Sequence, residues 1–255
     1  MGHLTTEDHN RLAELKNRIN TPGEFEQVIY VISHPRSGNT YTRYILENIT
    51  RFKSYGYIGS GDLDSIDNAG VLRDVPDSFF DSSGIIRKRH GFYKEMYSQT
   101  SPQKVIFILR NPIDIKYRDQ EIWNSTTPSS FNWKFYMKLV KQYLELSGFP
   151  KTMIRYEDLI GNPKNSINSV IAFLDPNASA DMIIRKQDFF DNLDFHIEKS
   201  RKRTPQSFKA QAMSWAEDFL AVDETPQEWR ELESKVRREY PEALEALKFV
   251  EGLYT

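Results

Sequence analysis

Apolar residues along the chain form two patterns: short continuous runs, and longer stretches with helical spacing. Continuous apolar runs between polar residues are typical of parallel strands that are buried on both faces. Four such runs predict strands, at Val28–Ser33, Gly84–Lys88, Val105–Leu109 and Thr152–Tyr156. The third run is the most apolar of the four.

Between these runs, apolar side chains recur every three or four residues, which predicts helices. The stretches with this spacing are 10–20, 41–49, 131–146, 163–174, 178–190 and 226–252. Asn162 followed by Pro163 is a helix start signal, because Asn caps the first turn and Pro fits the first helical position. Strands that alternate with helices predict an α/β fold, with a central parallel sheet covered by helices on both faces. Because no repeat or linker interrupts this alternation, we expect a single domain over residues 1–255.

The segment from Tyr55 to Ser83 follows neither pattern. It is rich in Gly, Ser and Asp, and Arg73 is its one basic residue. Its aspartates are Asp62, Asp64, Asp67, Asp74, Asp77 and Asp81. Long irregular segments inside compact domains are often functional loops, so we expect a loop or lid beside the substrate site. The alternative interpretation is a solvated surface loop.

Composition and charge exclude several classes of protein. Hydrophobic residues make up 39% of the 255 residues and charged residues 27%, as in a soluble globular protein. The net charge of −2 provides no overall basic field for non-specific binding of nucleic acid. The absence of cysteine excludes disulfides, thiolate catalysis and Cys-based zinc sites. The chain has no apolar run long enough to span a membrane, and its polar N-terminus is unlike a signal peptide, so we expect a cytoplasmic protein.

The turn after the first predicted strand has the features of an anion-binding loop. A helix that follows a parallel strand directs its N-terminal N–H groups and its dipole toward the sheet edge. Gly38 allows the backbone to approach a ligand closely, and Arg36 adds a planar positive charge. Further side-chain donors are offered by Ser37, Asn39 and Thr40. The alternative interpretation is a turn whose polar residues only cap the helix.

Four segments together resemble the sulfotransferases that depend on PAPS, 3′-phosphoadenosine 5′-phosphosulfate. Pro35–Tyr41 is similar to the P-K-S-G-T-T-W loop of that family. Lys88–His90 resembles the K-T-H element, and Leu109–Asp114 resembles the L-R-N-P-x-D element. Arg155–Leu159, followed by Pro163, resembles the Y-E-D-L…P element. All four occur in the family's order between residues 28 and 174.

The resemblance implies catalytic roles for three residues. His90 is expected to remove the proton of the acceptor hydroxyl, which suits a neutral imidazole near neutral pH. Lys88 and Arg36 are expected to stabilise the charge that develops between sulfur and the leaving phosphate. Arg36 departs from the family's Lys, and the two are not equivalent as proton donors. The alternative is that the two cations lie at strand ends without a role in the chemistry and that His90 is a surface residue.

The resemblance also implies a nucleotide-binding set. The residues of the loop from Arg36 to Tyr41 would hold the 5′-phosphosulfate. Arg110 would contact the 3′-phosphate. Arg118 stands where the family has a Ser on the same phosphate, so that contact is either absent or made by the guanidinium. The alternative for either arginine is a solvated charge on a helix. Tyr41, where the family has Trp, and Tyr156 would lie near the adenine; the alternative is that both are core residues. The basic run Arg201, Lys202 and Arg203 corresponds to the family's R-K-G-x-x-G-x-W element without its glycines, and a solvated face is the alternative there.

These features favour an enzyme that transfers a sulfuryl group from PAPS to a hydroxyl or nitrogen of a small acceptor. No metal is expected, because cationic side chains replace the magnesium used in phosphoryl transfer. A P-loop kinase or NTPase is the main alternative, but the G-K-[ST] sequence is missing. A non-catalytic nucleotide-binding module is a further alternative, against which His90 and Lys88 count. The aspartates of the segment 55–83 lead to the hypothesis that the acceptor is small and cationic.

Overall fold

The computed structural model describes the chain over 24–35, 37–55, 75–92, 103–116, 131–201 and 226–254. It also describes residues 10, 13–14, 17–18, 21 and 71–72, and of residues 201 and 226 it describes the backbone alone. The predicted helix over 10–20 lies mostly outside this range, and its described residues Asn10, Ala13, Glu14, Asn17 and Arg18 are helical.

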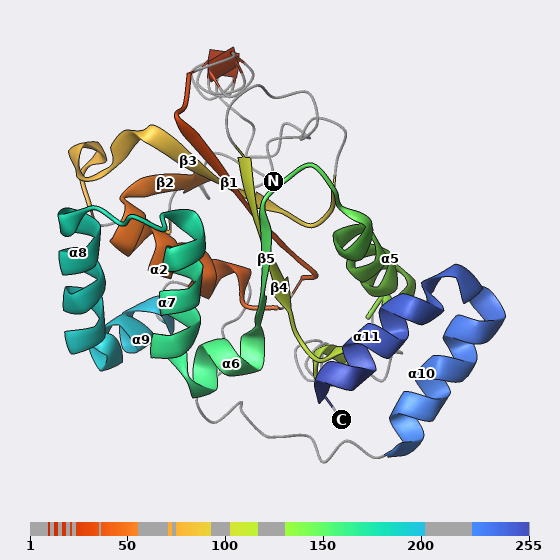
Figure 1. Cartoon of the computed structure of the whole chain (residues 1–255). Coiled ribbons are helices and arrows are strands. Elements are labelled where there is room, and N and C mark those ends of the chain that lie inside the picture. Colours follow the sequence, from red (N-terminus) through yellow and green to blue (C-terminus); the bar gives the residue numbers. More distant parts are fainter. Residues whose placement is uncertain are drawn as a thin grey trace.

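Five parallel strands form one sheet (Figure 1). The strands are β1 (Gln27–Ser33), β2 (Phe52–Tyr55), β3 (Asp81–Arg89), β4 (Gln103–Leu109) and β5 (Lys151–Arg155). Their order is β2-β3-β1-β4-β5, which places β1 at the centre. The predicted parallel sheet and its four strands are confirmed. The edge strand β2 was missed, because its four residues are too few to form an apolar run.

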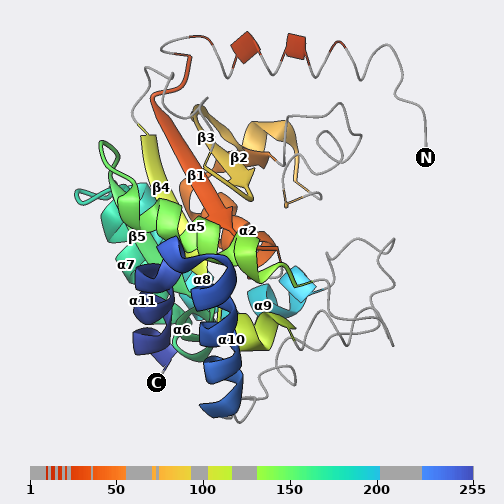
Figure 2. The ribbon, with the colours of Figure 1, turned by 90° about the vertical axis from the view of Figure 1, so that its right-hand side faces the viewer.

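The helices cover both faces of the sheet (Figures 1 and 2). They are α2 (Asn39–Thr50), α5 (Trp133–Glu145), α6 (Tyr156–Gly161), α7 (Pro163–Leu174), α8 (Ala180–Asp191), α9 (Leu193–Arg201), α10 (Pro226–Glu239) and α11 (Leu244–Tyr254). Successive residues of β1 point to opposite faces: Tyr30 packs with α5, α10 and α11, whereas Ile29 packs with α2, α7 and α8. The predicted α/β fold with helices on both faces is therefore confirmed.

Lysines near the beginnings of two strands cap the C-terminal ends of two helices. Lys151 Nζ donates to the main-chain oxygens of Tyr143, Leu144 and Leu146 at 2.7, 3.1 and 2.8 Å, at the end of α5. Lys104 Nζ donates in the same way to Phe173 and Leu174 at the end of α7. The last carbonyls of a helix lack intrahelical partners, and a cation there also favours the helix dipole.

Two expectations about the boundaries of elements are wrong. The helix expected over 226–252 is two helices, because Pro241 lacks an N–H and restricts Tyr240 to a non-helical conformation (φ −155°). The irregular segment expected over 55–83 is shorter, since Tyr55 ends β2 and residues 81–83 begin β3. The residues Asp-Ser-Ser have little strand propensity, but Asp81 pairs with Phe52 of β2 and the Ser83 carbonyl accepts a hydrogen bond from the Glu26 N–H at 2.7 Å.

Part of that segment is tied to the core by Glu47 of α2. This side chain is fully buried. Its Oε2 accepts hydrogen bonds from the backbone N–H groups of Val71 and Leu72 at 2.8 and 2.7 Å. Its Oε1 accepts from the backbone N–H of Ser54 at 2.9 Å and also from the Ser54 hydroxyl. One carboxylate therefore joins α2, β2 and residues 71–72 of the irregular segment.

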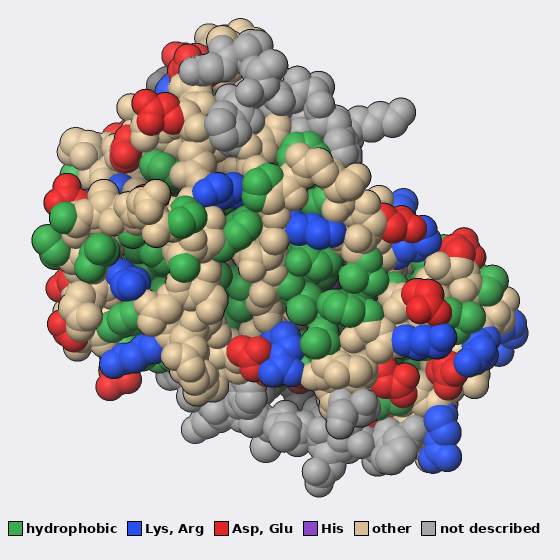
Figure 3. Space-filling view, viewed as in Figure 1, with side chains coloured by type: hydrophobic (Ala, Val, Ile, Leu, Met, Phe, Trp, Pro, Cys, Tyr) green, Lys and Arg blue, Asp and Glu red, His purple; other side chains and the backbone are tan. Residues whose placement is uncertain are grey.

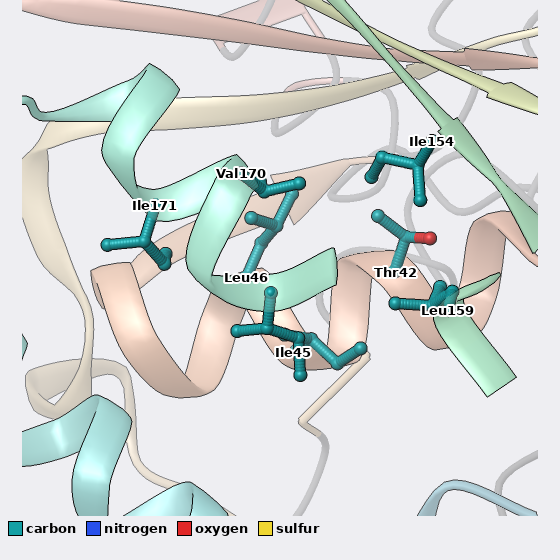
Figure 4. A pocket seen from close by; sticks show the side chains of 8 residues that line it. Thr42, Ile45, Leu46, Ile154, Leu159, Val170 and Ile171 are labelled. Atoms are coloured by element: carbon teal, nitrogen blue, oxygen red, sulfur yellow. The ribbon is translucent and has the colours of Figure 1, made fainter. Parts of the chain in front are cut away.

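A small apolar pocket lies inside the core between α2, α7 and the end of β5 (Figure 4). It is lined by Thr42, Ile45, Leu46, Ile154, Leu159, Ile167, Val170 and Ile171. Its one polar group, the Thr42 hydroxyl, already donates to the Gly38 carbonyl at 3.2 Å. The pocket therefore offers a ligand no free side-chain donor, and we interpret it as space left by side-chain packing.

On the face drawn in Figure 3, acidic and basic side chains are interspersed, and apolar side chains gather between β5, α5 and α11. Among the described residues, no helix is both long enough and apolar enough to cross a membrane.

Candidate functional site

The carboxyl ends of β3, β1, β4 and β5 bring the predicted motifs to one side of the sheet. Ser33 ends β1 and precedes the loop, His90 follows β3, and Arg110 follows β4. Tyr156 follows β5, whose last residue Arg155 is paired with Leu109. From β1 the chain passes through α2 to one edge of the sheet, and from β4 it passes through α5 to the other. Ligands of open α/β sheets bind at such a change of direction.

The loop between β1 and α2 is shaped around Gly38. Gly38 has φ 83° and ψ 14° and is the N-cap residue of α2. A Cβ atom at this position would lie 2.4 Å from Cδ2 of Tyr156. Both the left-handed backbone and the close ring require glycine here. The predicted anion loop is therefore in direct contact with Tyr156, one of the two tyrosines predicted near the adenine.

The first turn of α2 has the features of an anion site. Gly38 cannot cap the helix with a side chain, and the first turn contains no acidic residue. The hydroxyl of Ser37 is buried, with a residue exposure of 1%, and has no hydrogen-bond partner among the described residues. A buried hydroxyl without a partner is costly, and a bound anion would satisfy it. Thr40 is half-buried in the same turn.

The side chain of Asn39 binds strand β1, whereas we expected from the sequence that it would donate to an anion. Its Nδ2 donates to the Val31 carbonyl at 3.2 Å and to the Ser33 hydroxyl at 3.1 Å. The amide orientation is set by the Val31 carbonyl, which can only accept. Since both side-chain hydrogens are engaged with β1, Asn39 can offer an anion its main-chain N–H. This differs from the expectation that its side chain donates to the anion.

His90 is held in one tautomer by the end of β1. Its Nδ1 lies 2.8 Å from the main-chain oxygen of Ser33. That oxygen can only accept, so Nδ1 carries the hydrogen and Nε2 keeps a lone pair. Burial, followed by the charge of Lys88, lowers the pKa of His90 from 6.5 to about 4. The imidazole is therefore neutral near pH 7, the form that can accept a proton.

The two cations predicted beside His90 differ in what the structure describes of them. Lys88 belongs to β3, is half-buried, and lies close enough to His90 for its charge to lower the pKa of that imidazole. Arg36 lies outside the described residues. Arg118, Lys202, Arg203 and the side chain of Arg201 also lie outside them, as do Asp62, Asp64 and Asp67.

Arg110 and Tyr156 form a stacked pair. Cζ of Arg110 lies 4.3 Å from the centroid of the Tyr156 ring, and Nε of Arg110 forms an ion pair with Asp114. The backbone of Arg110 is held by Tyr136, whose hydroxyl donates to the Arg110 carbonyl at 2.7 Å. The site thus places a guanidinium, an aromatic ring and the Gly38 loop side by side.

Tyr41 and Tyr156 are both buried, each with an exposure of 4%, within the core on the α2 face. This burial agrees with the alternative that they are core residues, and contact with an adenine stays a prediction for both.

Sequence reasoning missed three residues of the site. The Ser33 carbonyl orients His90, Glu157 accepts a hydrogen bond from the Asn111 N–H, and His34 is buried beside Phe131, Phe135 and Tyr136. A main-chain carbonyl has no signal in a sequence. Glu157 had one, since it lies inside the Y-E-D-L element.

A family model described as a sulfotransferase domain matches residues 26–230, which is most of the chain. The chain belongs to the sulfotransferase family. The matched range contains every segment on which the resemblance was based, as well as the described strands. No curated protein matches this sulfotransferase in sequence.

Several solved structures are similar to this sulfotransferase. Mouse sulfotransferase SULT7A1, complexed with PAP, is 16% identical with 92% of each chain covered and a TM-score of 0.49. The sulfotransferase domain from the curacin biosynthetic pathway is 17% identical, covering 64% of this chain and 77% of that chain, with a TM-score of 0.42. Retinol dehydratase, in a complex with retinol and PAP, is 14% identical, covering 89% and 85%, with a TM-score of 0.49. The assignment to the family rests on the sequence match.

As a member of this family, the chain is an enzyme of sulfuryl transfer. Among the described residues, no group of three or more His, Asp or Glu side chains is arranged to hold a metal ion.

Proposed function

We propose that this sulfotransferase uses PAPS as the sulfuryl donor and His90 as the general base toward a small acceptor. The hydrogen bond from His90 Nδ1 to the Ser33 carbonyl carries this proposal. It leaves the Nε2 lone pair of His90 free to take a proton from the substrate that accepts the sulfuryl group. Ser33 directly precedes the loop that would hold PAPS.

In the proposed reaction, an oxygen or nitrogen of the acceptor attacks the sulfur of PAPS as its proton passes to His90 Nε2. The new bond to sulfur forms while the bond from sulfur to the bridging oxygen breaks. That oxygen leaves with the 5′-phosphate of adenosine 3′,5′-bisphosphate, PAP. Lys88 and Arg36 are proposed to stabilise its developing charge, because fixed cations favour the transition state over the ground state.

The described residues fit an anionic donor. The first turn of α2, which no side chain caps, is suited to the phosphosulfate, as is the Ser37 hydroxyl, which has no partner in the described part of the chain. Main-chain N–H groups of Gly38, Asn39 and Thr40 would complete this cradle. We propose that Arg110 binds the 3′-phosphate, together with Arg118 and the basic run 201–203, and that Tyr41 and Tyr156 lie near the adenine.

A thermal-shift experiment tests the donor. A ligand at a hundredfold excess over its Kd stabilises the native state by about 2.7 kcal/mol. We expect PAP to raise the melting temperature without magnesium, and ATP with magnesium to have little effect. The opposite pattern would favour a nucleoside triphosphate enzyme and overturn the proposal.

The substitution His90→Asn tests the base. Asn can still donate to the Ser33 carbonyl but has no basic nitrogen. We expect the variant to keep the PAP-induced shift and to lose sulfuryl transfer by about a hundredfold or more. Normal turnover by this variant would remove His90 from the mechanism.

The acceptor is proposed to be a small molecule with a hydroxyl or nitrogen nucleophile. A screen of acceptors with labelled PAPS would identify it. The hypothesis of a cationic acceptor rests on the aspartates of the segment 55–83. It predicts that neutralising Asp62, Asp64 and Asp67 together raises the KM for the acceptor, and an unchanged KM would argue against it.

A further inference from the structure

The helix α11 lies beyond the matched range 26–230, yet it contacts the strand ends of the site. The Tyr254 hydroxyl donates to Oε2 of Glu157 at 2.9 Å. Nη1 of Arg155 donates to the main-chain oxygen of Leu253 at 2.6 Å. The last turn of α11 is therefore tied to the junction of β5 and α6, near the ends of β4 and β5 (Figure 1).

Glu157 carries the contact onward to β4. Its other oxygen, Oε1, accepts a hydrogen bond from the backbone N–H of Asn111 at 3.0 Å. Asn111 directly follows Arg110, and Glu157 directly follows Tyr156. One carboxylate thus joins the two segments whose preceding residues, Arg110 and Tyr156, form the stacked pair.

Burial and hydrogen bonding affect the protonation of the Glu157 carboxyl group and the Tyr254 hydroxyl. Burial raises the pKa of Glu157, while the hydrogen bonds from Asn111 and Tyr254 act against that rise. Burial also raises the pKa of Tyr254, so its hydroxyl stays protonated and donates. A buried carboxylate that loses one of its donors is left partly unsatisfied and becomes free to turn.

We propose that Tyr254 is a positioning residue for nucleotide binding, acting through Glu157 to hold Arg110 and Tyr156 in their stacked arrangement. This inference rests on the proposed function, in which Arg110 binds the 3′-phosphate. It assigns a role in the site to a helix outside the matched family domain.

The test compares Tyr254→Phe with Tyr240→Phe in the full chain. Both substitutions remove one hydroxyl and keep the ring. Tyr240 is half-buried near α11, and its hydroxyl makes no hydrogen bond to the described residues, which makes it a matched control. Calorimetry would measure PAP binding, and hydrogen exchange would follow the amides of Asn111 and of Ile106 inside β4.

We expect Tyr254→Phe to weaken PAP binding about three- to tenfold, the range for one hydrogen bond. The Asn111 amide should exchange faster by a similar factor, while Ile106 is unchanged. Tyr240→Phe should match the wild type in both measurements. A melting temperature for each variant confirms that binding is measured on folded protein.

The outcomes separate the two proposals. If the wild type binds PAP and Tyr254→Phe binds it equally well, this inference is overturned and the proposed function is not. That conclusion holds whatever the exchange rates show. Equal weakening by Tyr240→Phe would also overturn this inference. Wild-type protein that does not bind PAP would overturn the proposed function and this inference with it.

Discussion

The ring of Tyr156 occupies the space that a side chain at Gly38 would need. A Cβ built on Gly38 would lie 2.4 and 2.6 Å from the Cδ2 and Cε2 atoms of Tyr156. Residue 38 lies in the loop after β1 and residue 156 follows β5, so the contact links two strand ends that are far apart in the sequence. The shape of the proposed phosphosulfate cradle depends on this contact.

The substitution Gly38→Ala is expected to destabilise the protein and weaken PAP binding. Gly148→Ala is the matched control, because Gly148 has φ 81° and no atom within 4 Å of the position of its Cβ. The control should lose about 1–2 kcal/mol of unfolding free energy for the left-handed backbone alone. Gly38→Ala should lose about 1–3 kcal/mol more, because the Tyr156 ring must move. If denaturant unfolding shows the same loss of unfolding free energy in both variants, the Tyr156 ring moves aside without destabilising the protein.

The burial of His90 predicts how stability depends on pH. The unfolded chain binds a proton at His90 near pH 6.5, whereas the folded protein does so near pH 4. The unfolded state therefore binds more protons between these values, and the unfolding free energy should fall as the pH falls through them. The contribution of His90 to this fall is on the order of 3 kcal/mol.

The control for this prediction is His90→Asn, which cannot titrate. Unfolding in denaturant at pH 7 and pH 4.5 should show a smaller loss of stability in the variant than in the wild type. Identical pH dependence in the two proteins would contradict the lowered pKa.

Glu47→Gln should detach Val71 and Leu72 from the core. The amide keeps one acceptor oxygen but places an NH₂ group against backbone N–H donors. We expect a loss of about 2–4 kcal/mol in unfolding free energy and faster hydrogen exchange at Val71 and Leu72. Glu145→Gln, in an exposed pair with Lys141, should change stability by less than about 0.5 kcal/mol. Unchanged exchange at residues 71–72 would show that another contact holds them.

Lys151→Met should loosen the end of α5. The substitution keeps the aliphatic stem and removes the three donors to the last carbonyls of the helix. We expect a loss of about 1–2 kcal/mol in unfolding free energy. Lys141→Met, which removes a half-buried lysine paired with Glu145 on the same helix, should cost less than about 0.5 kcal/mol. A similar loss in both variants would argue against the capping role of Lys151.

Local sequence patterns were sufficient to predict most of the regular secondary structure. Buried parallel strands need continuous apolar runs, so β1, β3, β4 and β5 were recognisable, whereas β2 has four residues and depends on pairing with β3. The Asn162–Pro163 start of α7 was also correct, because capping acts within a few residues. The break at Pro241 was missed because apolar spacing continues on both sides of it.

The sequence by itself determined four of the strands, the order of the motifs along the chain and the membership of the sulfotransferase family. Only the tertiary structure decided how the motifs act on one another. The tautomer of His90 depends on the Ser33 carbonyl, Asn39 turns toward β1, and Tyr254 of α11 donates to Glu157, 97 residues earlier in the sequence. These relationships involve main-chain atoms and residues distant in sequence, whose positions are set by the packing of the sheet and its helices.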